Sequence, residues 1–267
     1  MSIEKPQDII DYKRWLEANF KIGDSDLRKH EIHFESISLS LKAKFEQSSF
    51  WKAVNAQIKD WNDEYYSITG YQLLAEGTIV LVRKSYESFL LKTFRRNILE
   101  NRNWPEPPKG GWFLPENWIL RVKDIVRTLI VVKYLDGVDF VVKKLRAIQE
   151  ECDSCSEMDV SFEAREHGYY AAHIGVLFDT EIHDVNYVKS HQSINVEIQI
   201  ATQLQDVIRK LTHTFYETRR EQDESSASNR AWQWNYNSPE FVPNYLGHLL
   251  HFVEGMIMDI RTKERSE

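Results

Sequence analysis

The chain has 267 residues, a formal net charge of −7, and a composition that is 42% hydrophobic and 12% aromatic. This length fits one large domain or a core domain with helical additions, and this composition excludes a disordered chain. The acidic balance argues against a protein that coats nucleic acid, so we expect no DNA partner. It leaves room for a local basic cleft.

Helices are expected at the start of the chain. Residues 1–60 place apolar side chains such as Phe34, Ile37 and Leu41 three and four positions apart, which predicts two or three helices. The first ten residues are polar, and no apolar run reaches about 18 residues, so we expect no signal peptide and no membrane span. The expected location is therefore the cytoplasm.

The middle of the chain alternates predicted helices and strands. Helices are expected at 85–99, 138–150 and 204–220, strands at 78–82, 119–134, 159–162, 173–178 and 194–200, and a proline-glycine loop at 104–111. Residues 221–230 are polar and predict a linker, which an apolar helix at 245–260 follows. Such a pattern predicts an α/β (α+β) fold with a mixed sheet and flanking helices. We divide it into N-terminal helices (1–60), a core (61–220), and a linker with a C-terminal helix (221–267).

The only two cysteines, Cys152 and Cys155, form a lone CxxC pair. Two cysteines are too few for a disulfide scaffold. We interpret the pair as an ordinary loop between a helix and a strand rather than as a zinc or redox motif.

A basic segment opens the helix predicted at 85–99. Lys84, Ser88 and Lys92 are spaced i, i+4 and i+8, so they share one helix face. The free N–H groups and the positive dipole end of a helix that starts near Lys84 would suit a polyphosphate. The alternative is a solvated amphipathic face.

Two carboxylates interrupt apolar strands. Asp124 lies in the run 122–126, and Glu197 lies in the strand predicted at 194–200. Strand alternation puts Glu197 and Gln199 on one face and Val196 and Ile198 on the other. Two carboxylates on neighbouring strands would hold Mg²⁺ and activate a hydroxyl. The alternative is a half-exposed sheet face.

Gly168, just before Tyr169, predicts a turn that presents an aromatic ring for stacking on a nucleobase. The alternative is that the ring is a core residue.

The order of these segments resembles the synthetase domain of the RelA/SpoT family, which makes the alarmone (p)ppGpp. The resemblance covers about residues 60–220. It rests on Lys84–Ser88–Lys92, on Asp124–Ile125, on Asp136–Gly137 and the helix after them, on Gly168–Tyr169 with His173, on Glu197–Ile198–Gln199, and on Leu211–Thr212–His213.

The resemblance implies a pyrophosphokinase that moves the β,γ-pyrophosphate of ATP to a ribose 3′-hydroxyl. Asp124 and Glu197 would then be catalytic and would hold Mg²⁺, with Glu197 completing the metal site or acting as general base. The ATP phosphates would be bound by Arg83, Lys84, Ser88, Lys92 and Arg127, and the acceptor by Tyr169, His173 and Gln199.

This chain departs from the family pattern on the acceptor side. Ala201 stands where the family has arginine, Thr212 where it has glutamate, and Ala171 where it has serine. Leu129 replaces a further arginine, for which Arg127 is the expected substitute. The hydrolase half of the long family members is absent, which fits a toxin restrained by an antitoxin protein. We therefore expect the tRNA 3′-CCA end as acceptor, with Lys42, Lys44 and Lys52 on tRNA phosphates.

Four alternatives stay open at the level of sequence. The acceptor would instead be GDP, GTP or an adenine nucleotide in an alarmone synthetase, or the chain would be a catalytically dead binding module. The three lysines would instead lie on a solvated helix face. The apolar tail from Trp232 to Met256 predicts a helix that packs on the core, or else a surface for an antitoxin or for self-inhibition. His248 and His251 are expected to be packing or surface residues rather than metal ligands.

Overall fold

The computed structural model describes residues 4–75, 79–184, 188–220, 232–238 and 240–264, with residues 212–220 described as backbone only. The N-terminal region forms three helices, α1 (Ile9–Phe20), α2 (Asp24–Gln47) and α3 (Ser49–Thr69). The predicted apolar stripe of α2 is confirmed, because Phe34, Ile37 and Leu41 are all buried. Phe34 and Leu41 join a hydrophobic core that extends into the sheet.

Five strands form one mixed sheet, which confirms the predicted fold class. They are β1 (Val82–Arg83), β2 (Val126–Val132), β3 (Cys155–Ala164), β4 (Tyr170–His183) and β5 (Lys189–Thr202). Their order across the sheet is β1-β2-β5-β4-β3. β2 and β5 run parallel, whereas the other neighbouring pairs are antiparallel. The central position of β5 puts Glu197 in the middle of the sheet.

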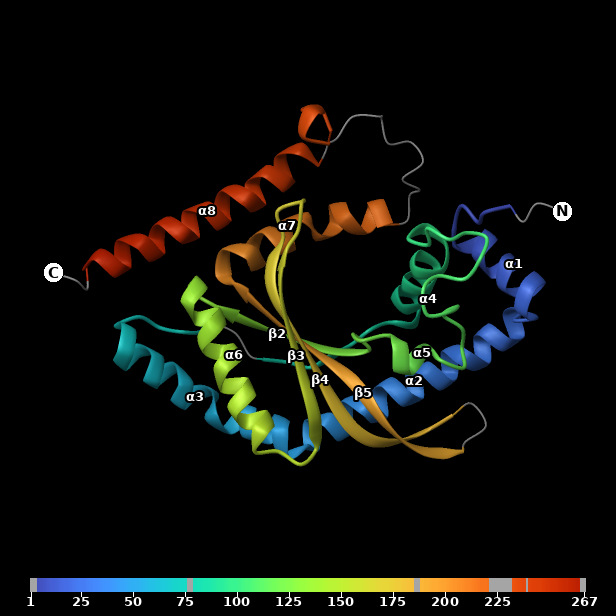
Figure 1. The fold of residues 1–267 in the computed structure, drawn as a ribbon, viewed down its shortest axis with the longest axis horizontal. Coiled ribbons are helices and arrows are strands. Elements are labelled where there is room, and N and C mark those ends of the chain that lie inside the picture. Colours follow the sequence, from blue (N-terminus) through green and yellow to red (C-terminus); the bar gives the residue numbers. More distant parts are fainter. Residues whose placement is uncertain (1–3, 76–78, 185–187, 221–231, 239, 265–267) are drawn as a thin grey trace.

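Helices cover both sides of this sheet. The remaining ones are α4 (Tyr86–Phe94), which continues into a π-helical turn (Arg95–Leu99), α5 (Trp118–Arg121), α6 (Leu135–Glu150), α7 (Gln203–Arg220), a short 3₁₀ helix η3 (Trp232–Trp234) and α8 (Phe241–Glu264). Figure 1 shows α3 and α6 together on one side, and α7 and α8 together on the opposite side. Of the helices in the described ranges, none is long and apolar enough to cross a membrane.

The strand predicted at 119–134 is wrong in its first part. The chain makes the short helix α5 there and becomes a strand only at Val126. Tertiary contacts override the β-branched composition: the Trp118 ring packs 4.8 Å from that of Phe89, and the Arg121 guanidinium lies 3.7 Å from the centre of the Phe113 ring. β3, β4 and β5 all extend beyond their predicted ends, and the predicted linker at 221–230 lies outside the described residues.

The cysteine pair lies at the predicted junction. Cys152 follows the end of α6 and Cys155 begins β3, and both thiols are free. Burial raises the pKa of the Cys155 thiol to about 11, which keeps it protonated at neutral pH. The pair therefore lies in the connection between a helix and a strand, as expected.

The C-terminal helix α8 is fixed to the core at two points. Near its start, Gly247 lies against Gly168, and His248 donates from Nε2 to the carbonyl oxygen of Glu166 at 2.8 Å. The Tyr170 hydroxyl donates to His248 Nδ1 at 2.8 Å, and the Tyr170 ring stacks on His251 with centroids 3.7 Å apart. Both histidines are therefore packing residues, as expected.

The second anchor is Arg261, near the end of α8. Its guanidinium is buried, lies 4.2 Å from the ring centres of both Tyr71 and Tyr134, and forms an ion pair with Asp136 at 3.1 Å. The Asp136 carboxylate also accepts a hydrogen bond from the Tyr65 hydroxyl at 2.7 Å. α8 is thus tied to the β3–β4 turn at one end and to the start of α6 at the other.

Candidate functional site

The basic segment lies at the start of α4. Ser85 caps this helix, because its hydroxyl accepts a hydrogen bond from the N–H of Ser88 at 3.2 Å. Just before the cap, the backbone N–H of Lys84 donates to the carbonyl oxygen of Ile125 at 2.9 Å. This bond holds the helix start beside the chain that enters β2. Ser88 also lies within hydrogen-bond distance of Ser85 through its hydroxyl, at 3.0 Å.

Asp124 is bound by two lysines of this segment. Its carboxylate accepts from Lys84 Nζ at 2.9 Å and from Lys92 Nζ at 2.7 Å. Burial raises the pKa of the Asp124 carboxyl, but the two ammonium groups outweigh that effect and hold the pKa well below its usual range. Burial also lowers the pKa of Lys84, and Asp124 opposes that shift. We call Lys84, Lys92 and Asp124 the lysine–aspartate triangle.

The two arginines predicted to bind ATP lie in different places. Arg127 is half-buried, stands opposite Glu197 in the β2–β5 pairing, and lies near enough to Lys84 to lower its pKa. Arg83 instead contacts α2, where its guanidinium donates to the Glu35 carboxylate at 2.9 Å and to the Ser38 hydroxyl at 3.0 Å. In this structure Arg83 therefore positions β1 against α2, whereas Arg127 lies between the triangle and Glu197.

Glu197 lies in a hydrogen-bonded chain on the polar face of the sheet. Its carboxylate accepts from Gln199 Nε2 at 2.8 Å and contacts His173 Nδ1 at 3.0 Å. The Tyr169 hydroxyl lies 3.1 Å from the other ring nitrogen of His173. Because an ionised carboxylate can only accept, His173 donates from Nδ1, and its Nε2 accepts the Tyr169 proton when the ring is neutral. The structure thus brings Tyr169, His173, Glu197 and Gln199 together, and the shared direction of Glu197 and Gln199 is the one that the alternation in β5 predicts.

Tyr169 follows a turn that only glycine fits well. Gly168 has φ of +80°, which is the left-handed region that other residues avoid. Burial, followed by the charges of Glu163 and Glu197, raises the pKa of Tyr169 to about 12, so the phenol stays protonated at neutral pH. The ring meets that of His173 edge-on, at 5.9 Å between centroids.

Sequence reasoning missed two acidic residues, one beside this hydrogen-bonded chain and one on α7. Glu163 on β3 lies 3.6 Å from His173 Nε2 and also binds Arg165. Asp206 on α7 is buried and forms ion pairs with Arg209 at 2.6 Å and Lys210 at 2.7 Å. The i, i+3 and i+4 spacing of Asp206, Arg209 and Lys210 on a predicted helix is the sequence signal for these ion pairs. Nothing in the local sequence marks Glu163, because its role comes from the β3–β4 register.

The substituted acceptor-side positions are packed rather than open. Ala201 and Ala171 are both buried, at 3% and 8% exposure. Neither position supplies a charge or a hydroxyl to the polar face. The third substituted residue, Thr212, lies where the structure describes only the backbone.

The donor set fits Mg²⁺ only in part. Within the described ranges, no group of three or more His, Cys, Asp or Glu side chains is placed to hold a metal ion. Mg²⁺ is usually held by one or two carboxylates together with the phosphates of a substrate. Asp124 and Glu197 suit that arrangement. Glu197 lies on β5, and Asp124 lies two residues before β2, the parallel neighbour of β5.

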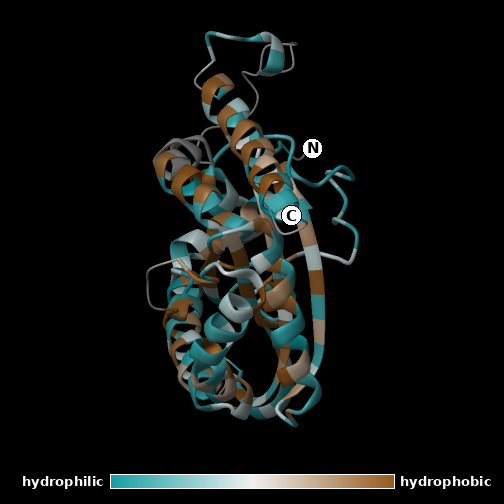
Figure 2. Ribbon diagram, turned by 90° about the vertical axis from the view of Figure 1, so that its left-hand side faces the viewer, coloured by the Kyte–Doolittle hydropathy of each residue, from teal (hydrophilic) through white to brown (hydrophobic). Residues whose placement is uncertain are grey.

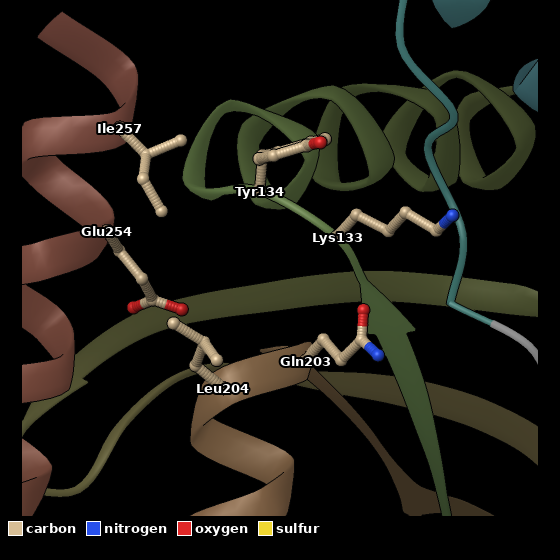
Figure 3. Close-up of a pocket in the computed structure, with 6 residues that line it drawn as sticks. All are labelled: Lys133, Tyr134, Gln203, Leu204, Glu254 and Ile257. Carbon is tan, nitrogen blue, oxygen red and sulfur yellow. The ribbon is translucent and has the colours of Figure 1, made fainter. Parts of the chain in front are cut away.

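One cavity lies apart from these residues. Figure 3 shows the side chains that line it, between α8 and the starts of α6 and α7. The volume of this cavity is about 180 Å³. Its lining includes Lys133, Tyr134 and Glu254, and none of the predicted site residues takes part. Burial raises the pKa of the Glu254 carboxyl, and His251 Nδ1 lies 3.4 Å from that carboxyl.

The fold agrees with that of solved small alarmone synthetases. The structure of small alarmone synthetase 1 from Bacillus subtilis bound to its product pppGpp is similar to this chain, with a TM-score of 0.52 and 16% sequence identity. The match covers 81% of this chain and 94% of that one. A second structure of the same synthetase gives a TM-score of 0.51 at 16% identity, over 84% and 98% of the two chains. No protein-family model and no curated protein sequence matches this chain.

Proposed function

We propose that this protein is an ATP-dependent pyrophosphokinase. The observation that carries the proposal is the adjacency of two groups in a synthetase fold: the lysine–aspartate triangle at the entry to β2, and the Tyr169–His173–Glu197 chain on the neighbouring strands. The first group offers cations for a polyphosphate, and the second offers a carboxylate base beside a half-buried aromatic ring.

The chemistry assigned to these residues is a phosphoryl-type transfer. The 3′-hydroxyl oxygen of the acceptor attacks the β-phosphorus of ATP, the bond from that phosphorus to the α,β-bridging oxygen breaks, and AMP leaves. Glu197 accepts the hydroxyl proton, while His173 and Gln199 hold its carboxylate in place. Lys84, Lys92 and Arg127 neutralise charge on the phosphates. Asp124 and Glu197 would hold Mg²⁺, which would supply further neutralisation of the phosphate charge.

For the acceptor we favour the 3′ end of tRNA, in a toxin that an antitoxin restrains. The support is the loss of charged and hydroxyl groups on the acceptor side, where Ala201 and Ala171 are buried alanines. The three lysines named for tRNA contacts give weaker support, because two of them already have partners within the chain. Lys42 forms an ion pair with Glu46, and Lys44 donates to the carbonyl oxygen of Glu181.

A free nucleotide is the second candidate acceptor. A structurally similar protein is bound to pppGpp, and the half-buried Tyr169 offers a ring to a base in either case. The test is incubation with γ-³²P-ATP, Mg²⁺ and one of GDP, GTP, ATP or deacylated tRNA. Label on tRNA supports the first candidate, and label on a nucleotide supports the second. A folded protein that labels none of them contradicts the proposal and leaves a binding module.

A further inference from the structure

Glu254 is a buried acid on the inner face of α8. It is the only Asp, Glu, Lys or Arg from Phe241 to Met258, and its side chain is 4% exposed. Figure 2 shows hydrophobic positions recurring along this helix, and the neighbouring side chains Val253 and Ile257 are half-buried. Burying a carboxylate in such surroundings is costly unless another group compensates its charge.

The described part of the chain compensates this carboxylate poorly. Neither oxygen of Glu254 makes a hydrogen bond of normal geometry with a described residue. Thr202, Gln205 and His251 lie near enough to lower its pKa, but burial raises that pKa more. His251 Nδ1 is 3.4 Å from the carboxylate, and its ring is stacked on that of Tyr170, at 3.7 Å between centroids. Both carboxylate oxygens therefore keep acceptor capacity that these neighbours leave unused.

Two cations in this region are held by other partners. Lys133 lines the same cavity as Glu254, but its Nζ donates to Gln72 Oε1 at 2.7 Å. Figure 3 shows that nitrogen turned away from the Glu254 carboxylate. Arg261, seven positions after Glu254 in α8, pairs with Asp136 at 3.1 Å. Neither side chain supplies the donor that Glu254 lacks.

The cavity lies at the carboxyl ends of two parallel strands. β2 ends at Val132 and leads into α6, and β5 ends at Thr202 and leads into α7. Ligands of α/β proteins commonly bind in a crevice at this edge of the sheet. Figure 3 shows the Glu254 side chain pointing from α8 toward the starts of these two helices. Asp124 precedes the other end of β2, so a strand of seven residues, which spans about 23 Å, separates it from the cavity.

The lining of the cavity is part apolar and part polar. Leu204, Ile257 and the Tyr134 ring give apolar surface, and Glu254 and Gln203 give polar atoms. Sites for small organic molecules combine an apolar lining with a few polar groups that fix orientation. The volume of about 180 Å³ holds about six groups of the size of water, at roughly 30 Å³ each. An ammonium group with about four or five carbons fits that space.

The charge of the lining selects the class of ligand. A carboxylate repels an anion, and the positive ends of α6 and α7, which lie at this cavity, favour the ionised form of Glu254. Mg²⁺ or Ca²⁺ needs several oxygen ligands, whereas among the described residues no three His, Cys, Asp or Glu side chains converge to hold a metal. A primary ammonium needs only one carboxylate, and its three N–H groups can donate to both oxygens.

We propose that this cavity binds a small organic cation, with a primary ammonium group on Glu254 and an aliphatic chain against Leu204 and Ile257. The ammonium donates to the two carboxylate oxygens, and the chain covers the apolar part of the lining. The proposal does not depend on the reaction or on its acceptor, because the cavity shares no residue with the candidate active site.

The test is a titration of the full chain with n-butylammonium chloride, followed by NMR of isotope-labelled isoleucine and leucine methyl groups. The methyl signals of Ile257 and Leu204 report occupancy of the cavity whatever the activity of the protein. We expect a saturable shift with a dissociation constant on the order of 1 mM, since a ligand of so few atoms has little binding energy. 1-Butanol and butyrate have the same chain length but are neutral and anionic. Both should bind at least about tenfold more weakly, because neither brings a charged donor to Glu254.

Two variants in α8 separate the role of Glu254 from that of the helix. Glu254→Gln keeps the shape of the side chain and removes its charge, so it should weaken n-butylammonium binding at least about tenfold. The matched control, Asp259→Asn, removes an exposed acid that pairs with Lys263 at 2.6 Å, and should leave binding unchanged. If circular dichroism shows that Glu254→Gln does not fold, Ile257→Phe fills the cavity instead and should abolish the shift of the Leu204 methyl signals.

Any other result overturns the proposal. No saturable shift of these methyl signals up to about 20 mM would mean that the cavity takes no ammonium. Equal binding of 1-butanol would mean an apolar cavity in which the charge of Glu254 has no part. Tighter binding of butyrate would identify an anion site at the starts of α6 and α7. Binding that Glu254→Gln leaves intact would place the ammonium on another group.

Discussion

Gly168 and Gly247 meet with no side chain between them: a Cβ on Gly247 would lie 2.3 Å from the carbonyl oxygen of Gly168. Gly247→Ala must therefore push α8 away from the turn before Tyr169, and we expect a loss of about 1–3 kcal/mol in the free energy of unfolding. Urea denaturation measures it. Gly255→Ala in the same helix is the control, since nothing lies within 4 Å of its added methyl. It should stabilise the protein by up to about 1 kcal/mol, through helix propensity. Equal effects of both changes would contradict this packing.

Removing the carboxylate of the lysine–aspartate triangle should destabilise the fold as well as abolish activity. Asp124→Ala leaves the ammonium of Lys84, whose side chain is 11% exposed, without its anion. We expect a loss of about 3–5 kcal/mol, the usual effect of removing one partner of a buried ion pair. The control is Asp159→Ala, whose pair with Lys123 is 3.7 Å long with both side chains 67% exposed. Its effect in the same urea experiment should stay within about 0.5 kcal/mol.

The same aspartate should give stability a characteristic pH dependence. The pKa of Asp124 in the folded state lies below its unfolded value of about 3.9. Its stabilising contribution is therefore fully present above that unfolded value and is lost as the pH falls through the lower, folded value. We expect the urea midpoints of wild type and Asp124→Asn to differ by a constant amount above about pH 5 and to converge below about pH 4. A difference that grows on acidification would contradict the assignment.

The proposed base should affect the rate of transfer more than ATP binding. Glu197→Gln keeps the shape but cannot accept a proton, so we expect kcat to fall roughly 10²- to 10⁴-fold with a smaller change in the KM for ATP. The measurement is transfer of label from γ-³²P-ATP to whichever acceptor the labelling assay identifies. Unchanged turnover in this variant would remove Glu197 from the chemistry.

Two neighbouring tyrosines allow the candidate site and the packing of α8 to be tested separately. Tyr169→Phe removes the hydroxyl that holds His173 and should slow transfer roughly tenfold, the value of one hydrogen bond to a polar partner. Tyr170→Phe removes the hydroxyl that binds His248 in α8. It should lower stability by about 1 kcal/mol and preserve transfer. The reverse pattern would mean that the two rings have been assigned to the wrong roles.

The strand alternation around Glu197 is local, so the sequence predicts it well. One side of β5 holds Val196, Ile198 and Ile200 in the core, and the other holds Glu197 and Gln199. The predicted helix face does not include Lys84, because α4 begins only at Tyr86; Lys84 and Lys92 nevertheless both reach one carboxylate. Prediction succeeds for the alternation in β5, where a two-residue pattern decides the geometry.

Prediction fails where distant segments decide the geometry. Arg83 is chemically suited to phosphate, yet Glu35, 48 positions earlier in the chain, binds it. Glu163 comes beside His173 through the register of β3 and β4, which no local pattern specifies. The apolar tail predicts a helix packed on the core, and α8 packs there, but no local pattern shows that Gly247 and Arg261 fix it in place.

The lysine–aspartate triangle has a consequence for the time between two reactions. Under the proposed function, the pocket must hold its lysines in place when no phosphate is present, although burial lowers the pKa of Lys84. The carboxylate of Asp124 accepts hydrogen bonds from both ammonium groups and opposes that shift. In that proposal Asp124 is a stand-in for the ligand, and an arriving phosphate meets cations that are already arranged.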